Sequence, residues 1–111
     1  MIAKEFYTKL VGIYLQNKEK ELVIGFSEQW KGINAIVFEE ETDKLLVVAK
    51  DLSDYIYSNT KTILVVLKDV KLLNDKADLS KEIVVYDKGK YHKIIDIHID
   101  IDDCIVIDIE E

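Results

Sequence analysis

Asp96, His98 and Asp100 are the residues whose types and spacing come closest to a chemical site in this chain. They alternate along the sequence, so in a β-strand all three side chains project from one face. Two carboxylates and an imidazole are acceptable ligands for a divalent metal ion. Alternate strand residues lie about 6.7 Å apart, so a metal site would need help from another strand, for which His92 is the candidate. The same pattern fits a solvated strand face, which is the interpretation we favour, and we predict no cofactor.

Cys104 is the second residue with possible chemistry, as a nucleophile with His98 as its base. No basic neighbour or helix N-terminus is evident to lower its pKa, and a free cysteine commonly packs as a small apolar side chain. The four glycines are isolated and form no phosphate-binding loop, and one cysteine cannot make a zinc-ligand pair. We therefore expect a protein that is not an enzyme.

Trp30 is the single tryptophan and lies between two predicted strands. An exposed tryptophan would be a candidate binding residue, because tryptophan is enriched at the energetic centres of interfaces. The alternative, which we favour, is that Trp30 folds back over one end of the fold, since large aromatic side chains are mostly buried.

The segment that must position most of these residues is the C-terminal one, 94–111. It holds seven carboxylates and no lysine, whereas 1–93 balances its acids with lysines, so the segment carries the whole net charge of −7. From Ile95 on, its isoleucines fall on odd positions, which predicts extended chain with isoleucine on the core side. Aspartates and His98 then form an acidic outer face, comprising Asp96, His98, Asp100, Asp102 and Asp108.

The aspartates at 102–103 predict a reversal of the chain within this segment. A three-residue loop at 102–104 would pair Ile101 with Ile105 and Ile99 with Ile107, which keeps both isoleucine stripes on one face. A two-residue loop would separate the stripes, and one continuous strand would turn Asp103 toward the core at a cost of several kcal/mol. We therefore predict a hairpin with an odd-length loop.

Short runs rich in Val, Ile, Leu and Tyr, separated by polar turns, recur along the rest of the chain. They predict a mainly β, antiparallel barrel or sandwich of about eight short strands, in a single domain over 1–111. The turn residues favour hairpins at 17–20, 40–43 and 87–90, and capping residues favour one short helix near 51–59. The predicted strands are 7–16, 21–26, 33–40, 44–50, 62–72, 82–87, 91–101 and 104–109.

The composition restricts partner and compartment. All 15 cations are lysine and the pI is near 4.8, so the chain lacks arginine forks for phosphate and repels nucleic acid. No apolar run reaches the roughly 18 residues of a membrane span, and the first residues do not resemble a signal peptide. A single cysteine also suits a reducing compartment. We predict a cytoplasmic protein that binds neither nucleic acid nor membrane.

These features predict a protein-binding module, such as an inhibitor or immunity-type protein, that presents its acidic C-terminal hairpin to a basic partner protein. An alternative is a structural domain that forms homodimers through its C-terminal edge strand, because an uncovered isoleucine-rich edge invites pairing. A third is a β-barrel that binds a metal or small ligand.

Overall fold

The computed structural model describes residues 1–17, 20–52, 61–73, 79–100 and 104–111. The described part contains two helices and six strands. In chain order they are α1 (Ala3–Tyr14), β1 (Leu22–Ile24), β2 (Gly32–Glu39), β3 (Lys44–Lys50), α2 (Ile63–Leu73), β4 (Ile83–Asp87), β5 (Lys90–Ile99) and β6 (Ile105–Ile109).

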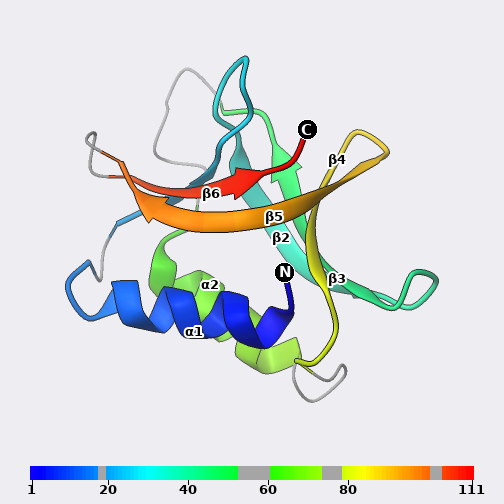
Figure 1. The fold of residues 1–111 in the computed structure, drawn as a ribbon, viewed down its shortest axis with the longest axis horizontal. Coiled ribbons are helices and arrows are strands. Elements are labelled where there is room, and N and C mark those ends of the chain that lie inside the picture. The colour runs from blue at the N-terminus through cyan, green and yellow to red at the C-terminus, as the bar shows by residue number, and fades with distance from the viewer. Residues whose placement is uncertain (18–19, 53–60, 74–78, 101–103) are drawn as a thin grey trace.

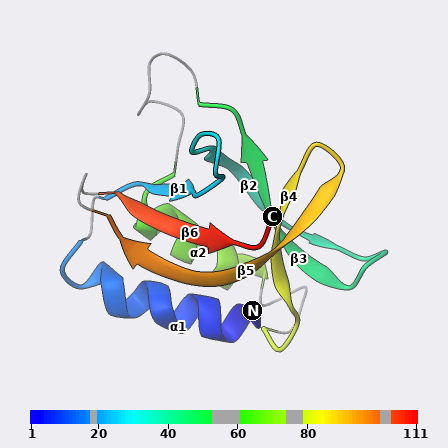
Figure 2. The same cartoon turned by 45° about the horizontal axis from the view of Figure 1, so that its top comes forward.

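The strands form one curled sheet in the order β1-β6-β5-β4-β3-β2 (Figure 1). Two pairs, β1 with β6 and β3 with β4, are parallel, and the other three are antiparallel. The sheet curls so far that its two edge strands, β1 and β2, come together. Ile24, the last residue of β1, pairs with Lys31, which precedes β2, through two backbone N–H···O hydrogen bonds of 2.7 and 3.0 Å. The result is a half-barrel whose two edges meet at one point, with both helices on its concave side (Figure 2).

The mainly β class is confirmed, but the prediction of an antiparallel barrel or sandwich of about eight strands is wrong, because two strand pairs are parallel and two of the predicted strands are helices. The predicted strand 7–16 is part of helix α1 as far as Tyr14. The spacing of Ala3, Phe6 and Leu10, all with 0% exposure, places them on one helical face. The alternating Tyr7, Val11 and Ile13 fitted a strand equally well by sequence, and burial of the helical face decided between the two patterns.

Segment 62–72, also predicted as a strand, is helix α2. Its buried residues Ile63, Val66, Leu67 and Val70 follow helical spacing. Their β-branched types had favoured a strand. The parallel pairing of β3 with β4 explains the outcome, because a chain that joins parallel neighbours must cross back over the sheet, and a helix usually makes that crossover.

The predicted short helix near 51–59 cannot be compared with the structure over most of its length, since 53–60 lie outside the described residues. Asp51 and Leu52, which are described, belong to no helix or strand. Within the described ranges, neither α1 nor α2 is long and apolar enough to cross a membrane.

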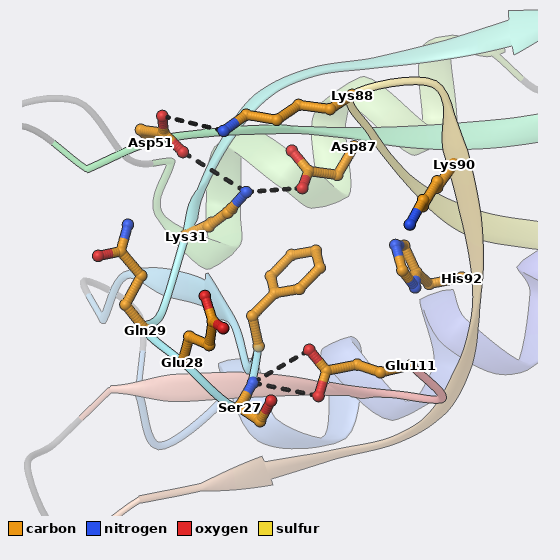
Figure 3. A pocket seen from close by; sticks show the side chains of 11 residues that line it. Ser27, Glu28, Gln29, Lys31, Asp51, Asp87, Lys88, Lys90, His92 and Glu111 are labelled. Carbon is orange, nitrogen blue, oxygen red and sulfur yellow. Dashed lines mark hydrogen bonds and ion pairs between the residues drawn. The ribbon is translucent and has the colours of Figure 1, made fainter.

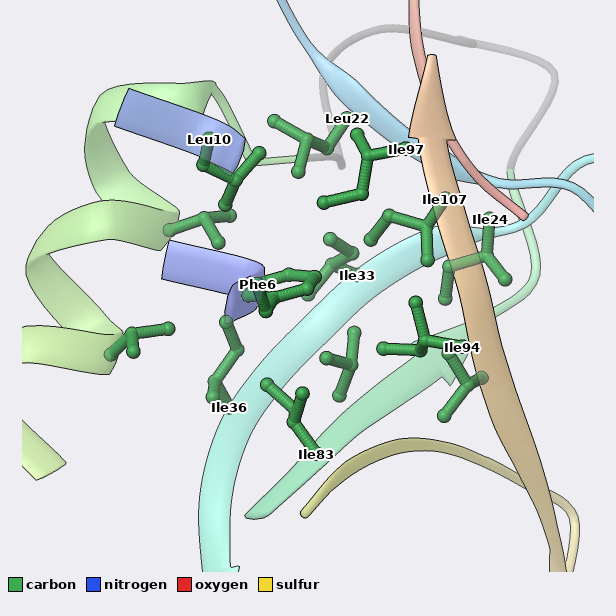
Figure 4. Close-up of a cluster of buried hydrophobic side chains, with 14 of the residues drawn as sticks. Phe6, Leu10, Leu22, Ile24, Ile33, Ile36, Ile83, Ile94, Ile97 and Ile107 are labelled. Carbon is green, nitrogen blue, oxygen red and sulfur yellow. The ribbon is translucent and has the colours of Figure 1, made fainter. Parts of the chain in front are cut away.

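The core lies between the helices and the concave face of the sheet. Phe6 from α1 stands at its centre, among isoleucines from the sheet such as Ile33, Ile83 and Ile107 (Figure 4). Each of these four side chains has 0% exposure. The core thus brings α1 into contact with strands from the first half of the chain (β2) and from the second (β4 and β6).

The predicted C-terminal hairpin is present as β5 and β6, with a different register. Ile97 pairs with Ile107 and Ile99 with Ile105, so odd positions pair with odd positions as predicted. The predicted pairs of Ile105 with Ile101, and of Ile107 with Ile99, are wrong by two residues. Residues 101–103 lie outside the described ranges, and beside them the Asp100 N–H donates to the Cys104 carbonyl at 2.9 Å.

A β-bulge between Ile94 and Asp96 interrupts the isoleucine stripe of β5. Ile94 and Ile97 are buried, with 4% and 7% exposure, whereas Ile95 is 60% exposed. The extra residue shifts the alternation by one position, so the even-numbered Ile94 faces the core and the odd-numbered Ile95 does not. The predicted uniform inward stripe therefore holds only in part.

Candidate functional site

The outer face of the C-terminal hairpin brings together three of the predicted site residues. Asp96 pairs with Asp108 across the two strands, and His98 pairs with Val106. His98 Nδ1 lies 2.7 Å from Asp108 Oδ2, within hydrogen-bond distance. The neighbouring Ile97 faces the core, so these alternating side chains face away from it. Asp100 is half-buried, and Asp102 lies outside the described residues.

The carboxylate of Asp96 lies at the edge of β5, where it contacts both β5 and α1. It accepts a hydrogen bond from the Ile97 N–H at 2.8 Å and an ion-pair contact from Lys9 Nζ at 3.1 Å. The backbone N–H of Ile97, followed by Lys9, lowers the pKa of the Asp96 carboxyl below its usual range. Asp96 therefore connects the hairpin to α1 as well as facing solvent.

The metal site weighed as the alternative for Asp96, His98 and Asp100 finds no ligand cluster in the described part of the chain. Among the described residues, no group of three His, Cys, Asp or Glu side chains is arranged to hold a metal ion. Asp96 contacts Lys9 and His98 contacts Asp108. His92, considered as a fourth ligand, lies in a pocket at the other end of β5.

Trp30 lies over β1 and β6, whereas the favoured alternative placed it over one end of the fold. It is partly buried and packs against Val23, Cys104 and Val106, a small apolar cluster distinct from the main core. Cys104 has only 6% exposure. This burial beneath an aromatic cover is typical of a structural cysteine rather than a reactive one.

One stretch of β5 has a strand partner on a single side. In the described pairings β4 covers only Lys90–Lys93 of β5, and β6 covers Ile94–Ile99 from the other side. The N-terminus explains why β5 separates from β4. The Met1 carbonyl accepts the Ile83 N–H at 2.9 Å, so the start of the chain occupies the position beside β4.

A second candidate site, which the sequence did not predict, is a pocket at the open end of the half-barrel. It has a volume of about 590 Å³ and is lined from five segments of the chain (Figure 3). They are the β1–β2 connection, Asp51 after β3, the β4–β5 turn, His92 on β5, and Glu111 after β6.

The β4–β5 turn forms one wall because its sequence suits a tight reversal. Asp87 pairs with Lys90, and Lys88 and Gly89 between them have φ of +48° and +84°. Two positive φ angles are typical of the hairpin turn that matches strand twist, and glycine adopts them without steric cost. The hairpin predicted at 87–90 is confirmed.

Lys31 forms the floor of the pocket. Its Nζ lies 2.6 Å from Asp87 Oδ2, 3.5 Å from Asp51 Oδ1 and 4.9 Å from the centroid of the Phe26 ring. The hydrogen bond with Asp87 raises the pKa of Lys31, against the opposing effect of burial. The two carboxylates are therefore already engaged by the lysine, which stays charged.

Glu111 closes one side of the pocket. Its two carboxylate oxygens lie 3.1 and 3.2 Å from the Ser27 backbone nitrogen, which donates to them. The Ser27 hydroxyl and then its N–H lower the pKa of the Glu111 carboxyl. The His92 ring packs edge-on against Phe26, with centroids 5.3 Å apart. The pocket thus joins a carboxylate-binding turn to an aromatic wall.

Sequence reasoning missed this pocket because its residues form no local motif. His92 was considered only as an auxiliary metal ligand, and Glu111 stands 84 residues from Ser27 in the chain. The one available signal was the alternation of Lys90, His92 and Ile94, which places polar side chains on the same face as a buried isoleucine. Comparisons with protein-family models, curated proteins and solved structures found no significant match.

Proposed function

We propose that this protein is a non-enzymatic binding module, of inhibitor or immunity type, that docks its C-terminal hairpin on a basic protein. The observation that carries the proposal is the outer face of β5 and β6. The side chains of Asp96 and Asp108 there are 55% and 37% exposed, and 94–111 has no lysine. Such a face attracts cationic surfaces and accelerates their association at low salt.

An apolar side chain stands beside these charges. Ile95, next to Asp96 on β5, is 60% exposed, whereas Ile99, at 47%, shares the face of the buried Ile97. Burial of apolar surface contributes about 25 cal/mol per Å², while the carboxylates orient the partner. A combination of exposed isoleucine and carboxylate supports a protein partner over a nucleic acid, which the carboxylates would repel.

Self-association is the second candidate, because Ile94–Ile99 pairs with β6 and, among the described residues, with no strand on its other side. Two features weigh against it. Asp96 already accepts the Ile97 N–H, which points away from β6, so one donor of the open edge is occupied. Two copies paired through this edge would also bring like charges together. We therefore favour a basic partner over a second copy, and we assign both protein and partner to the cytoplasm.

The proposal is tested by capture of partners on the immobilised protein at about 0.05 M and about 0.5 M salt. The wild type is compared with a variant that carries Asp96→Asn, Asp100→Asn and Asp108→Asn. We expect basic proteins to bind the wild type at low salt and to be lost in the variant, because neutral amides remove the attraction.

The matched control carries Glu5→Gln, Glu40→Gln and Glu41→Gln, the same charge change at exposed positions away from the hairpin. It should capture partners as the wild type does. Equal loss of partner capture in both variants would mean that only the net charge of the protein matters. Unchanged capture by the hairpin variant would mean that the hairpin does not bind the partner. A stable dimer at high salt in light scattering would favour self-association instead.

A further inference from the structure

The pocket at the open end of the half-barrel contains a carboxylate held by a backbone N–H. Both oxygens of Glu111 approach the Ser27 nitrogen, at 3.1 and 3.2 Å, where the chain turns between β1 and β2. A carboxylate that accepts from a backbone N–H forms a charge-assisted hydrogen bond, which is stronger than a neutral one. The turn at Ser27 is therefore able to bind an anionic oxygen.

The surroundings of this turn favour a single negative charge. Lys90 and His92 alternate on β5 and line the pocket beside Glu111 (Figure 3). Lys31 is engaged by Asp87 and Asp51, so its charge is already balanced. A dianion such as phosphate is less favoured, because Glu28 also lines the pocket and carries a negative charge.

The pocket also offers an apolar wall. Phe26 packs against the edge of the main core, and the edge-on His92 ring extends its surface. The volume of about 590 Å³ lies within the range of small-molecule sites. Mouths of β-barrels are common positions for such sites, and this pocket lies where the Ile24–Lys31 pair brings the two edges of the sheet together.

We propose that this pocket binds a small organic monocarboxylate with an aromatic or aliphatic body, and that Glu111 occupies the carboxylate position in the free protein. The ligand carboxylate takes the Ser27 N–H, its body packs on Phe26, and Lys90 and His92 stand beside the negative charge. Glu111 moves to solvent when the ligand binds. The site is separate from the outer face of the hairpin, so the protein-binding proposal does not depend on it.

Glu111 acts in this arrangement as a tethered competitor of the ligand. A side chain held near its site competes with an effective concentration in the millimolar range. Removal of its carboxylate should therefore tighten the binding of a free carboxylate. Glu110 is the matched control, because it carries the same charge one residue away, is exposed, and does not line this pocket.

The experiment titrates the wild type, Glu111→Ala and Glu110→Ala with benzoate and follows backbone amide shifts by NMR. We expect the Ser27 amide of Glu111→Ala to shift saturably, with an affinity about tenfold or more above that of the wild type. Glu110→Ala should bind as the wild type does. Lys90→Gln, added to Glu111→Ala, should weaken benzoate by a few-fold, because the charge it removes lies at the pocket mouth.

Two further probes define the ligand class. Benzamide has the shape of benzoate without its charge and should leave the Ser27 amide unshifted, and inorganic phosphate should bind more weakly than benzoate. The proposal is overturned if benzoate does not shift this amide in Glu111→Ala, if Glu110→Ala gains as much affinity, or if benzamide or phosphate binds as well as benzoate. Capture of a basic protein by the hairpin would be unaffected by any of these results.

Discussion

The two faces of the sheet differ in how completely they are buried, and β6 allows a direct comparison. On the concave side, Ile105 and Ile107 have 0% exposure beneath the helices. On the outer side Val106 is nearly as buried, at 2%, but its cover is a small cluster with Trp30. Farther along the outer face, Asp96 and His98 contact solvent.

This difference separates stability from recognition. The concave face depends on a continuous apolar core that draws on both helices and the sheet, so a cavity there affects many contacts. The outer face has smaller apolar groups, the cluster with Trp30 and the buried pair of Leu46 with Val84, beside exposed side chains, which can change at lower cost. The two proposed binding surfaces therefore lie on the outer face and at the open end of the half-barrel, and the continuous core lies on the concave face.

The largest expected effect is on the concave face. Phe6→Ala should lower the free energy of unfolding by about 3–5 kcal/mol, because it removes a fully buried aromatic ring at the core centre. Urea unfolding followed by circular dichroism measures it. The control on the same helix is Val11→Ala at an exposed position, which should change stability by only about 0.5 kcal/mol. Similar losses in both variants would contradict the assigned core.

A smaller effect is expected from removal of the outer cover. Trp30→Ala should cost about 2 kcal/mol, less than a full core truncation, because the ring is only partly buried. It should also expose Cys104, so that a thiol reagent labels this cysteine faster than in the wild type. Phe6→Ala, under conditions where it remains folded, should leave labelling slow. Equal labelling of Trp30→Ala and the wild type would show that Trp30 does not protect the thiol.

The close approach of β1 to β6 predicts a third effect. A Cβ added at Gly25 would lie 2.9 Å from Val106 Cγ1, so Gly25→Ala should destabilise the fold by about 1–2 kcal/mol. Val106→Ala should relieve the clash, and the double variant should lose less than the sum of the two single losses. Thermal unfolding of the four proteins gives this coupling.

Gly12→Ala serves as the control for this pair. Gly12 lies in α1 with no atom within 4 Å of its added Cβ, so alanine should stabilise the helix by roughly 0.5–1 kcal/mol. A strictly additive pair at Gly25 and Val106 would contradict the close contact between β1 and β6.

The smallest effect concerns an exposed pair on the outer side. The Tyr91 hydroxyl donates to Glu39 Oε1 at 2.7 Å, and this hydrogen bond raises the pKa of Tyr91 to about 12. The raised pKa favours the neutral tyrosine in the folded protein. Its stabilising contribution is therefore complete below the unfolded pKa of about 10 and is lost as pH rises toward 12.

Absorbance titration of tyrosinate measures this pKa directly. Glu39→Gln should return the Tyr91 titration toward pH 10, and Tyr91→Phe should remove the latest step from the titration curve. If the wild type and Glu39→Gln titrate alike, the hydrogen bond to Glu39 does not hold the proton.

Local chemistry explains which elements were predicted correctly. The turn at Lys88 and Gly89 and the odd-to-odd pairing of the C-terminal isoleucines depend on residues close in sequence. The register of that hairpin was missed because the pair next to the turn is Ile99 with Ile105, so the connection is two residues longer than the predicted three. The bulge between Ile94 and Asp96, which no local pattern revealed, shifts the pairing only at Ile94.

Helix α2 shows the limit of composition. Its valines and its one isoleucine favour a strand by intrinsic preference, and their helical spacing became decisive only because β3 and β4 lie parallel and need a crossover. The candidate sites divide in the same way. The alternation of residues in the sequence predicted that Asp96 and His98 face outward. Their contacts, of Asp96 with Lys9 and of His98 with Asp108, depend on how α1 and β6 pack and could not be predicted.

The amino-acid sequence alone determined the mainly β class, the extended acidic C-terminal segment and its hairpin, because alternation and turn chemistry act over a few residues. Tertiary structure alone decided the two helices, the half-barrel and the pocket that joins Ser27, Lys31 and Glu111. These features bring together segments distant in the chain, and the curl of the sheet, driven by burial of one shared core, determines where those segments meet.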